Sequence, residues 1–594
     1  MLDDSRATPA HTQRDGVDHV PTPPFYLFAQ HFSAIAAAGP IVGPILACKS
    51  FGWLPCLLWI GGGVVFVGAM HDFTTLVASV RHGGVSIAEI ARERLGGPAG
   101  RAMMAFIWIA LIYVIVAFVD ITAGTFVAGS EELAGTRTEF NPGGAVAAAS
   151  SLYLALAVVM GLVQRWFSPP LWLLTVVFVP ATFGVAWLGT QLSNALVFEQ
   201  RTWGLLIVAY CCIASVLPVW ALLQPRGYLG GFVLYAALAL GVVGIVFGGY
   251  SIEQPAFTGF DAGGATGQLF PFLFVTIACG ACSGFHGLVC SGTTSKQIDR
   301  ESHACFVGYG AMLAEAFVAL IALVTIMIVA PADVGGLTPN KIFGNGIGRF
   351  LTLVIGEDHR EFAITFGAMA LSTFVFDTID VATRLGRYLV QELLGWKGRA
   401  GAVGATLITI APACGFLCFS APGSYRVFWT LFGASNQLLA ALTLVSIAVW
   451  LRQEKRGIRF VAVPAVLLLA ITAWALGTLL VTNVRASHGL DVACANAVAS
   501  GVLLALVGAW FDVAVLEPER TLILRSSLAL PKATHFDPAG RPPRAFNDST
   551  WGFFLHPTQD GGTRLVVTGV GRGEPRRVRS CVRTSGRAFK QDAP

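Results

Sequence analysis

Seven ionisable residues lie inside long apolar stretches of the sequence, where charged side chains are rare. They are His71, Asp72, Asp120, His286, Glu315, Asp377 and Asp380. An ionised side chain at the centre of a bilayer costs about 2.5–3.5 kcal/mol, so each such group needs a partner or a function. A single one could be structural, hydrogen-bonded across two helices. Seven together favour a polar pathway through the membrane, in which carboxylates and imidazoles could carry a proton.

Two glycine–proline pairs interrupt the apolar stretch HFSAIAAAGPIVGPILAC at positions 31–48. Gly39-Pro40 and Gly43-Pro44 are unexpected there, because proline lacks the amide hydrogen of a helix interior and glycine loosens the backbone. Non-helical backbone is tolerated at membrane depth only beside protein or a water-filled cavity. The pairs therefore predict an unwound segment that forms a binding site. The alternative is a kink that serves helix packing.

A second interrupted stretch, FLFVTIACGACSGFHGLVCSGTTSKQI, covers positions 272–298. Two interrupted spans of opposite direction are typical of the central site of an inverted-repeat transporter. The amides at the start of a half-helix attract an anion such as a carboxylate. Cys279 and Cys282 could form a redox or metal motif, but among small apolar residues they behave as small hydrophobes. The polar side chains of this stretch include Ser283, His286, Ser291, Thr293 and Thr294.

The elements that must position these residues are transmembrane helices. Of the 594 residues, 55% are hydrophobic and only 12% are charged, well below the charged share of soluble domains. Apolar windows long enough to cross a bilayer recur about fourteen times, so the sequence predicts an all-α polytopic membrane protein with inverted repeats and discontinuous helices. The windows cover residues 28–49, 53–79, 103–129, 144–163, 170–190, 203–223, 228–248, 268–292, 304–330, 362–383, 401–419, 425–450, 459–482 and 494–515.

The distribution of basic residues orients the chain. With the N-terminus in the cytoplasm, the outward loops carry about half as many basic residues as the inward loops, and both termini are cytoplasmic. Lys341, Arg349 and Arg360 share one long outward loop that contains the glycine-rich segment 343–350. The inward loops hold Arg81, Arg92, Arg94, Arg101, Arg165, Arg226, Lys296, Arg300, Arg384, Arg387, Lys397, Arg399, Arg452, Lys455, Arg456 and Arg459.

Three regions follow from this division. Residues 1–24 are polar and predicted to be a disordered cytoplasmic leader, and residues 25–516 form the transmembrane domain. Residues 517–594 form a basic cytoplasmic tail whose charge accounts for the net +5, so the membrane part offers no nucleic-acid surface. A turn at residues 560–562 predicts a β-hairpin in this tail. The sequence contains no Walker motif that would indicate ATP as an energy source.

Five segments of the sequence resemble one known family. They are HFSAIAAAGPIVGP, GAMHDFTTLVASVRHGG, ACSGFHGLVCSGTTSKQI, DVATRLGRYLVQELLG and FGASNQLLAALTL, and the family is the carbon starvation protein A family. The resemblance implies a bacterial inner-membrane transporter of peptides or, in some members, of pyruvate with proton coupling. It also implies the paired inverted repeats of the amino acid-polyamine-organocation superfamily. The site residues that it implies are His31, Gly39, Pro40, Gly43, Pro44, His71, Asp72, Ser283, His286, Ser291, Thr293, Thr294, Asp380, Asn436 and Gln437.

These observations predict a secondary active transporter that imports a short peptide or pyruvate in response to carbon starvation. We expect half-helix amides and the hydroxyls at 283–294 to hold the substrate's carboxylate. Membrane lipids are expected partners, and enzyme activity, a cofactor and a metal are not expected. At Asp377 the family usually has a small or hydroxyl residue, so this acid is a departure. Coupling to a proton or sodium is assigned to His71, Asp72, Asp377 and Asp380, with His286 as a further proton carrier.

Three alternatives stay open. An ion channel would need a continuous ring of like groups, whereas these polar residues are scattered and mixed in sign. A nutrient sensor would bind the same ligand without transporting it. An intramembrane metalloenzyme is disfavoured because its histidines lack ligand spacing such as HExxH. Its ligands would be His31, His71, Asp72 and His286.

Overall fold

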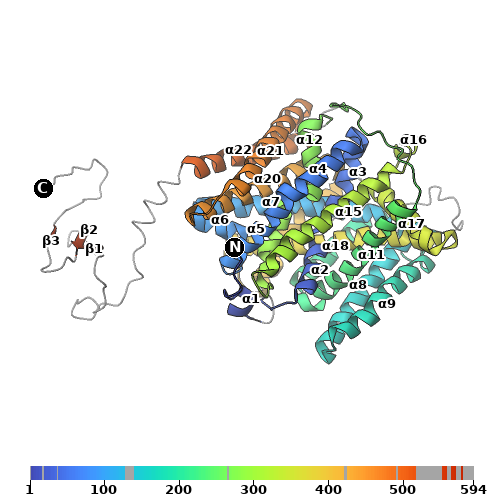
Figure 1. The fold of residues 1–594 in the computed structure, drawn as a ribbon, viewed down its shortest axis with the longest axis horizontal. Helices are drawn as coiled ribbons and strands as arrows, with labels where there is room; N and C mark the ends of the chain where they lie inside the picture. Colours follow the sequence, from blue (N-terminus) through green and yellow to red (C-terminus); the bar gives the residue numbers. More distant parts are fainter. Residues whose placement is uncertain are drawn as a thin grey trace. The chain divides into compact units, whose positions relative to one another are not determined.

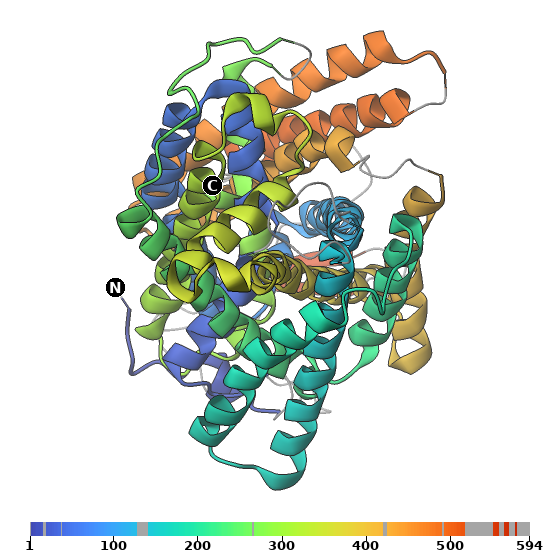
Figure 2. The ribbon, with the colours of Figure 1, turned by 90° about the vertical axis from the view of Figure 1, so that its right-hand side faces the viewer.

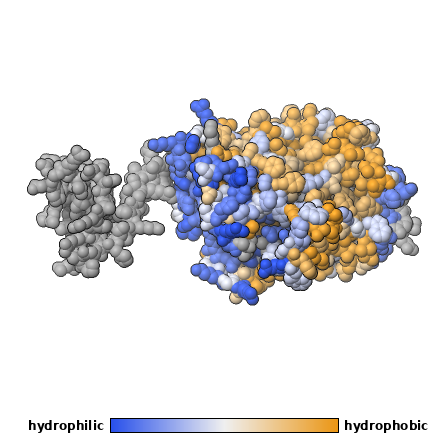
Figure 3. All heavy atoms as spheres, turned by 60° about the horizontal axis from the view of Figure 1, so that its bottom comes forward, coloured by the Kyte–Doolittle hydropathy of each residue, from blue (hydrophilic) through white to orange (hydrophobic). Residues whose placement is uncertain are grey.

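The computed structural model describes residues 2–15, 19–36, 38–127, 140–263, 267–419, 425–489, 492–516, 551–557, 563–569 and 577–578. It consists of two compact units, Met1–Pro518 and Glu519–Pro594. The first unit is an all-α polytopic membrane protein (Figures 1 and 2). On the face shown in Figure 3, apolar side chains gather in a broad band between hydrophilic regions, as expected of a surface in contact with lipid.

The helices of the first unit are named here in chain order. Up to residue 247 they are α1 (Pro9–Thr12), α2 (Pro24–Ile35), α3 (Gly39–Phe51), α4 (Trp53–Gly63), the π-helical turn η1 (Val64–Gly68), α5 (Ala69–Arg81), α6 (Ile87–Leu95), α7 (Gly97–Phe126), α8 (Pro142–Phe167), α9 (Leu171–Gln191), α10 (Gln200–Val216), the 3-10 turn η2 (Val219–Ala221) and α11 (Leu223–Phe247). They continue with α12 (Leu269–Thr276), α13 (Ala278–Ala281), α14 (Gly284–Gly292), the 3-10 turn η3 (Thr294–Lys296), the π-helical turn η4 (Cys305–Tyr309), α15 (Gly310–Met327), α16 (Pro331–Val334), α17 (Pro339–Ile355), the 3-10 turn η5 (Glu357–His359), α18 (Arg360–Leu394), α19 (Gly398–Phe419), α20 (Tyr425–Gln453), α21 (Arg459–Ala486) and α22 (Val492–Leu516).

Local sequence signals set several helix ends. The side chains of Ser86, Asn141 and Thr338 accept hydrogen bonds from backbone amides at the starts of α6, α8 and α17. Gly395, with a φ of +67°, takes the left-handed conformation that ends α18. These boundaries are therefore encoded by neighbouring residues and do not depend on contacts with other helices.

The number of membrane spans differs from the prediction. Among the described residues, ten helices are long and apolar enough to span a membrane, or eleven if α2 and α3 count as one span. α10 and the stretch Ala493–Ala509 of α22 are apolar but shorter, and the window 268–292 is divided among α12, α13 and α14. Each predicted window contains helix, but the count of about fourteen spans is not confirmed. A hydropathy window measures composition and does not detect a break in the helix.

The two interrupted spans pack against each other in opposite directions. α3 lies against α12 and α13, whereas α2 lies against α14. The first half of one span therefore contacts the second half of the other, which requires the spans to be antiparallel. Figure 1 shows α3 beside α12, with α2 towards the opposite side of the unit. Paired inverted repeats would give this arrangement.

The segment predicted as a loop around residues 343–350 is a helix instead. α17 includes Lys341 and Arg349 and packs along α18. At Gly348, a Cβ would lie 3.3 Å from the Cα of Ile364 in α18, so glycine lets the two backbones approach closely. The glycines of this segment therefore serve helix packing. The buried apolar residues of α17 include Ile342, Phe343, Ile347 and Phe350.

The N-terminal leader makes specific contacts over residues 2–15. Asp4 accepts hydrogen bonds from the backbone amide and the hydroxyl of Ser302, at 2.8 and 2.7 Å. The Thr8 hydroxyl donates to the carbonyl oxygen of Ile298 at 2.7 Å. The prediction of disorder is wrong for these residues, because their polar side chains have partners on the segment that follows η3.

Three strands are described in the second unit. β1 (Trp551–Pro557) and β2 (Thr563–Gly569) pair antiparallel, with Pro557 opposite Thr563, and β3 (Arg577–Val578) pairs with β2. The predicted turn at 560–562 and most of the basic tail lie outside the described residues.

Gly43 of α3 lies against the backbone of α12. A Cβ at this position would lie 2.5 Å from the carbonyl oxygen of Thr276, so alanine would push the helices apart. We expect Gly43→Ala to lower the free energy of unfolding by about 1–3 kcal/mol, the usual cost of overpacking. Gly61→Ala is the matched control, because nothing lies within 4 Å of its Cβ and alanine favours a helix. Thermal unfolding of both purified variants measures the difference, and equal melting temperatures would contradict this packing.

Candidate functional site

Two histidines and two acids form a buried chain of contacts between α5, α14 and α15. Asp72 forms hydrogen bonds with both histidines, with His71 Nδ1 at 2.7 Å and with His286 Nδ1 at 2.8 Å. On its other side, His286 Nε2 lies 3.0 Å from Glu315 Oε2. All four side chains are at most 1% exposed. We refer to these four residues as the His–Asp–Glu network.

Close packing of α14 against α5 assembles this network. His71 and Asp72 lie in the first turn of α5, directly after the π-helical turn η1. Gly287 of α14 faces His71, and a Cβ at this glycine would lie 3.2 Å from the His71 Cε1. The absence of a side chain at Gly287 therefore lets α14 approach α5 closely enough for His286 to reach Asp72.

The two contacts of His286 determine how many protons the network holds. A neutral imidazole offers one donor and one acceptor nitrogen, and an ionised carboxylate only accepts. Because both nitrogens of His286 face carboxyl groups, either the imidazole is doubly protonated or one carboxyl is protonated. In both cases the site holds one proton more than a neutral imidazole between two carboxylates. Such a group can bind and release a proton as its surroundings change.

A second buried group, the arginine–aspartate cluster, joins α11 to α18. Arg226 has a side chain that is 0% exposed, and it donates from Nε to Asp377 Oδ1 at 2.7 Å and from Nη1 to Asp380 Oδ2 at 2.5 Å. The Tyr210 hydroxyl of α10 donates to the same Asp380 oxygen at 2.7 Å. The Ser33 hydroxyl of α2 donates to Asp377. One guanidinium thus holds the two carboxylates that lie one turn apart on α18.

The prediction that Arg226, Arg384 and Arg387 lie in cytoplasmic loops is wrong. Arg226 lies in the first turn of α11, and the other two lie within α18, where each residue is 8% exposed. Arg384 Nη2 donates to the carbonyl oxygens of Ala214 and Leu217, both at 2.8 Å. Arg226 and Arg384 are tolerated inside the protein because carboxylates or carbonyl groups replace the water that they lose.

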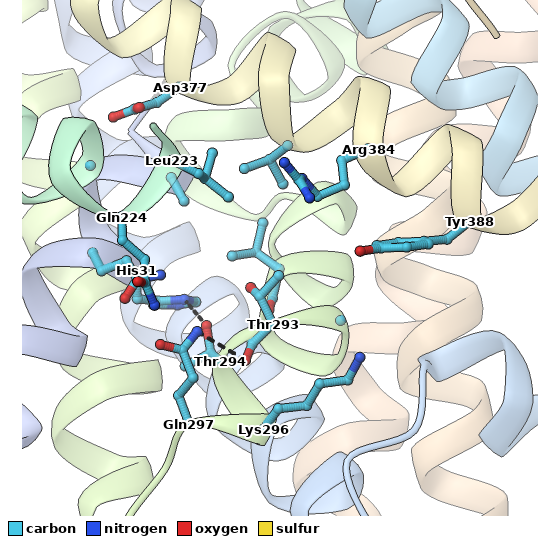
Figure 4. Close-up of a pocket in the computed structure, with 16 residues that line it drawn as sticks. His31, Leu223, Gln224, Thr293, Thr294, Lys296, Gln297, Asp377, Arg384 and Tyr388 are labelled. Atoms are coloured by element: carbon cyan, nitrogen blue, oxygen red, sulfur yellow. Dashed lines mark hydrogen bonds between the residues drawn. The ribbon is translucent and has the colours of Figure 1, made fainter. Parts of the chain in front are cut away.

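A polar pocket lies between α2, α11, α14, η3 and α18 (Figure 4). Its wall includes two cations, Lys296 of η3 and Arg384 of α18. His31 of α2 also lines it and pairs with the Thr294 hydroxyl, 2.8 Å from Nδ1. Two cations, several amides and hydroxyls around one space are the donors that a carboxylate requires. The other lining residues are Gln30, Ala34, Leu223, Gln224, Gly227, Val289, Gly292, Thr293, Gln297, Asp377, Val381 and Tyr388.

The predicted site residues divide among these groups. His31, Thr293, Thr294 and Asp377 line the pocket. His71, Asp72 and His286 belong to the His–Asp–Glu network, and Asp380 belongs to the arginine–aspartate cluster with Asp377.

The start of α14 is capped by protein. Asn436 of α20 accepts a hydrogen bond from the Phe285 amide at 2.9 Å, and its Nδ2 donates to the Ser283 hydroxyl at 3.1 Å. A Cβ at Gly284 would collide with the Asn436 carbonyl oxygen, so α14 and α20 are in close contact. In this conformation the Phe285 amide, predicted to hold a substrate carboxylate, binds a side-chain amide oxygen.

The glycine–proline pairs lie past the break between α2 and α3. α2 ends at Ile35 and α3 begins at Gly39, and Pro40 occupies the first turn of α3, where proline is tolerated. Pro44 lies inside the helix, so the prediction of an unwound segment is wrong for the second pair. A Cβ at Gly39 would collide with Cys279 Sγ of α13. The glycines of these pairs therefore bring the two interrupted spans into contact.

Ser291 and Gln437 lie outside the pocket, the network and the cluster. The Ser291 hydroxyl accepts a hydrogen bond from the Ile87 amide at 3.2 Å, which joins α14 to α6. Gln437 accepts from the Thr472 hydroxyl at 3.3 Å, which joins α20 to α21. Both residues therefore connect neighbouring helices.

Sequence reasoning missed the cationic part of the site. Lys296 and Arg384 line the pocket, and Arg226 holds Asp377 and Asp380, yet all three had been assigned to loops by the charge pattern. One signal could have found a buried cation. The predicted spans contain six acids, whereas their only basic residues, Lys49, Arg426 and Arg459, lie within two residues of the end of a window. Acids without a cation at the same depth are costly in a bilayer.

Known proteins resemble this chain over most of its length. The carbon starvation protein CstA family matches residues 1–340 and 334–475. The pyruvate/proton symporter BtsT of Escherichia coli K12 is 33% identical over 569 residues, covering 80% of this chain and 77% of that protein. The peptide transporter CstA of Bacillus subtilis 168 is 33% identical over 556 residues, covering 85% and 90%. Among solved structures, a manganese transporter of Eremococcus coleocola has a TM-score of 0.47 and 13% identity, covering 86% of this chain and 98% of that one. The chain belongs to the carbon starvation protein CstA family.

Proposed function

We propose that this protein is a secondary active transporter that imports a short peptide or pyruvate together with a proton across the inner membrane. The relatives named above as a pyruvate/proton symporter and a peptide transporter support this choice of substrates, since both kinds of ligand carry a carboxylate. A role in the response to carbon starvation belongs to the same proposal and is supported by the name of the family.

The observation that carries the proposal is the position of His286 between Asp72 and Glu315. The three residues lie on α14, α5 and α15, so the proton that they share stabilises the packing of α14 against two other helices. Loss of that proton would leave buried carboxyl groups facing a neutral ring, which favours separation of the helices. α14 also contributes Val289 and Gly292 to the pocket. Protonation of His286 is thereby linked to the shape of the pocket.

The pocket supports a substrate that carries a carboxylate. Lys296 and Arg384 offer positive charge, and Gln224 and Gln297 offer amide groups. Charge-assisted hydrogen bonds of this kind are stronger than those between neutral groups. The amides can additionally pair with the peptide groups of a dipeptide, whereas pyruvate would use the cations.

We further propose that both termini are cytoplasmic. When the three buried arginines are left out of the count, the inward loops still carry more basic residues than the outward loops. Arg101, Arg300, Lys397, Arg399 and Lys455 are exposed there. Lys296 is also one of the basic residues assigned to the inward loops. The pocket that it lines therefore lies towards the side that the charge pattern assigns to the cytoplasm.

Uptake into proteoliposomes tests the proposed function. We expect labelled Ala-Ala or pyruvate to accumulate above the external concentration when the medium is more acidic than the lumen. Accumulation should stop when a protonophore removes the gradient. Accumulation driven by sodium alone would contradict proton coupling. Saturable binding without uptake would indicate a sensor, and flux that neither saturates nor accumulates would indicate a channel.

A further inference from the structure

Asp377 separates the pocket from the guanidinium group of Arg226. The Asp377 side chain lines the pocket, and its Oδ1 accepts the hydrogen bond from Arg226 Nε at 2.7 Å. Arg226 itself is fully buried, and the adjacent Gly227 lines the pocket without a side chain. The Asp377 carboxylate therefore occupies the position from which a ligand in the pocket would reach the guanidinium.

The charges around Asp377 balance without a ligand. Asp377 and Asp380 carry two negative charges, and Arg226 and Arg384 carry two positive charges. Lys296 adds a positive charge to the pocket wall that can balance a ligand carboxylate. If that carboxylate takes the guanidinium of Arg226, however, Asp377 is left ionised and buried without its cation, which is costly. Uptake of one proton removes this cost. Asp377 is the acid placed to take it, since Asp380 is held by Arg226 and Tyr210 and lies behind the pocket wall.

We propose that Asp377 is an exchangeable partner of Arg226. When a ligand carboxylate binds in the pocket, Asp377 takes up a proton from the medium and the ligand carboxylate replaces it on the guanidinium. This inference rests on the proposed function, because it requires a carboxylate ligand in this pocket. Arginine suits the exchange, since a guanidinium can bind either carboxylate through two parallel hydrogen bonds.

The surroundings of Asp377 can accommodate the added proton. The Ser33 hydroxyl now donates to Asp377, and a hydroxyl can also accept, so Ser33 can receive the bond from a protonated carboxyl. Gly230 of α11 leaves space beside this pair, because a Cβ there would lie 3.0 Å from Asp377 Oδ2. The charged and titratable groups that surround Asp377 or face it across the pocket are Arg226 of α11, Tyr210 of α10, Tyr153 of α8, Asp380, Arg384 and Tyr388 of α18, His31 of α2 and Lys296 of η3.

Calorimetric titration of the purified protein with pyruvate and with Ala-Ala tests the exchange. Titrations in two buffers of different ionisation enthalpy give the number of protons taken up per ligand. We expect about one proton per ligand for the wild-type protein, and therefore a Kd that rises about tenfold for each pH unit above neutrality. Asp377→Asn should bind both probes without proton uptake and with a Kd that does not depend on pH, because an amide cannot titrate.

Asp120→Asn is the matched control. Asp120 is a buried acid of α7 whose carboxylate accepts a hydrogen bond from Gln200 at 2.7 Å, outside the pocket, so its variant should keep the wild-type proton count. Pyruvamide, which lacks the carboxylate, should bind without proton uptake. A proton count that Asp377→Asn leaves unchanged would overturn the exchange, as would a folded Asp377→Asn that binds neither probe. Either result would indicate that Asp377 is a fixed cross-link between α11 and α18.

The exchange and the proposed function can fail separately. Proteoliposomes that bind the probes but do not accumulate them would overturn the transport function. The number of protons taken up per ligand, and with it the exchange at Asp377, would be unaffected. Proton-driven accumulation with a proton count that Asp377→Asn does not alter would overturn the exchange alone.

Discussion

His286→Gln is expected to abolish proton-driven accumulation while the exchange of substrate across the membrane persists. A glutamine side chain can donate to Asp72 and accept from a protonated Glu315, but it cannot gain or lose a proton. The gradient would then have no titrating group between α5 and α15 on which to act. In proteoliposomes we expect the internal substrate concentration to reach the external one without exceeding it. Counterflow of labelled substrate should continue.

Two further variants sharpen this prediction. Glu315→Gln should give the same loss of accumulation, because it removes the second carboxyl that faces His286. His359→Gln, in the exposed turn η5, should behave like the wild-type protein. Wild-type accumulation by His286→Gln would mean that the His–Asp–Glu network only holds the helices together.

The membrane fold could be predicted from the sequence because a bilayer restricts composition strongly. Every backbone polar group of a span must be satisfied within the protein, so spans are helical and apolar, and interruptions are conspicuous. The same reasoning selected His71, Asp72 and His286, since a buried charge needs a partner. The structure places both histidines in contact with Asp72. Their part in coupling stays a prediction.

Contacts between distant segments could not be predicted from one sequence. Asn436 caps α14 from a position 151 residues away from Phe285, and no local pattern indicates which helix supplies that cap. The glycine-rich sequence of α17 is typical of a loop, and the proximity of α15 and α18 explains its glycines. The buried position of Arg226 could not be predicted for a related reason. It lies in the first turn of α11, where a basic residue ordinarily marks the adjacent loop.

Arg226→Met is expected to destabilise the protein severely. The substitution would leave Asp377 and Asp380 buried without their shared cation, and breaking a buried ion pair from one side costs about 3–5 kcal/mol. We expect little folded protein after solubilisation, measured by size-exclusion chromatography and thermal unfolding. Arg201→Met, at an exposed position of α10, should unfold at the wild-type temperature.

Removal of all three charges should restore the fold. Replacement of a whole buried ion cluster by hydrophobic residues of similar volume is often neutral or stabilising, so the triple variant Arg226→Met, Asp377→Leu, Asp380→Leu should regain most of the lost stability. This variant also separates the structural role of Arg226 from ligand recognition. It should be folded yet bind pyruvate and Ala-Ala far more weakly than the wild-type protein, because no guanidinium stands behind the pocket wall. A folded triple variant with wild-type affinity would show that Lys296 and Arg384 suffice for the carboxylate and that Arg226 serves the fold alone.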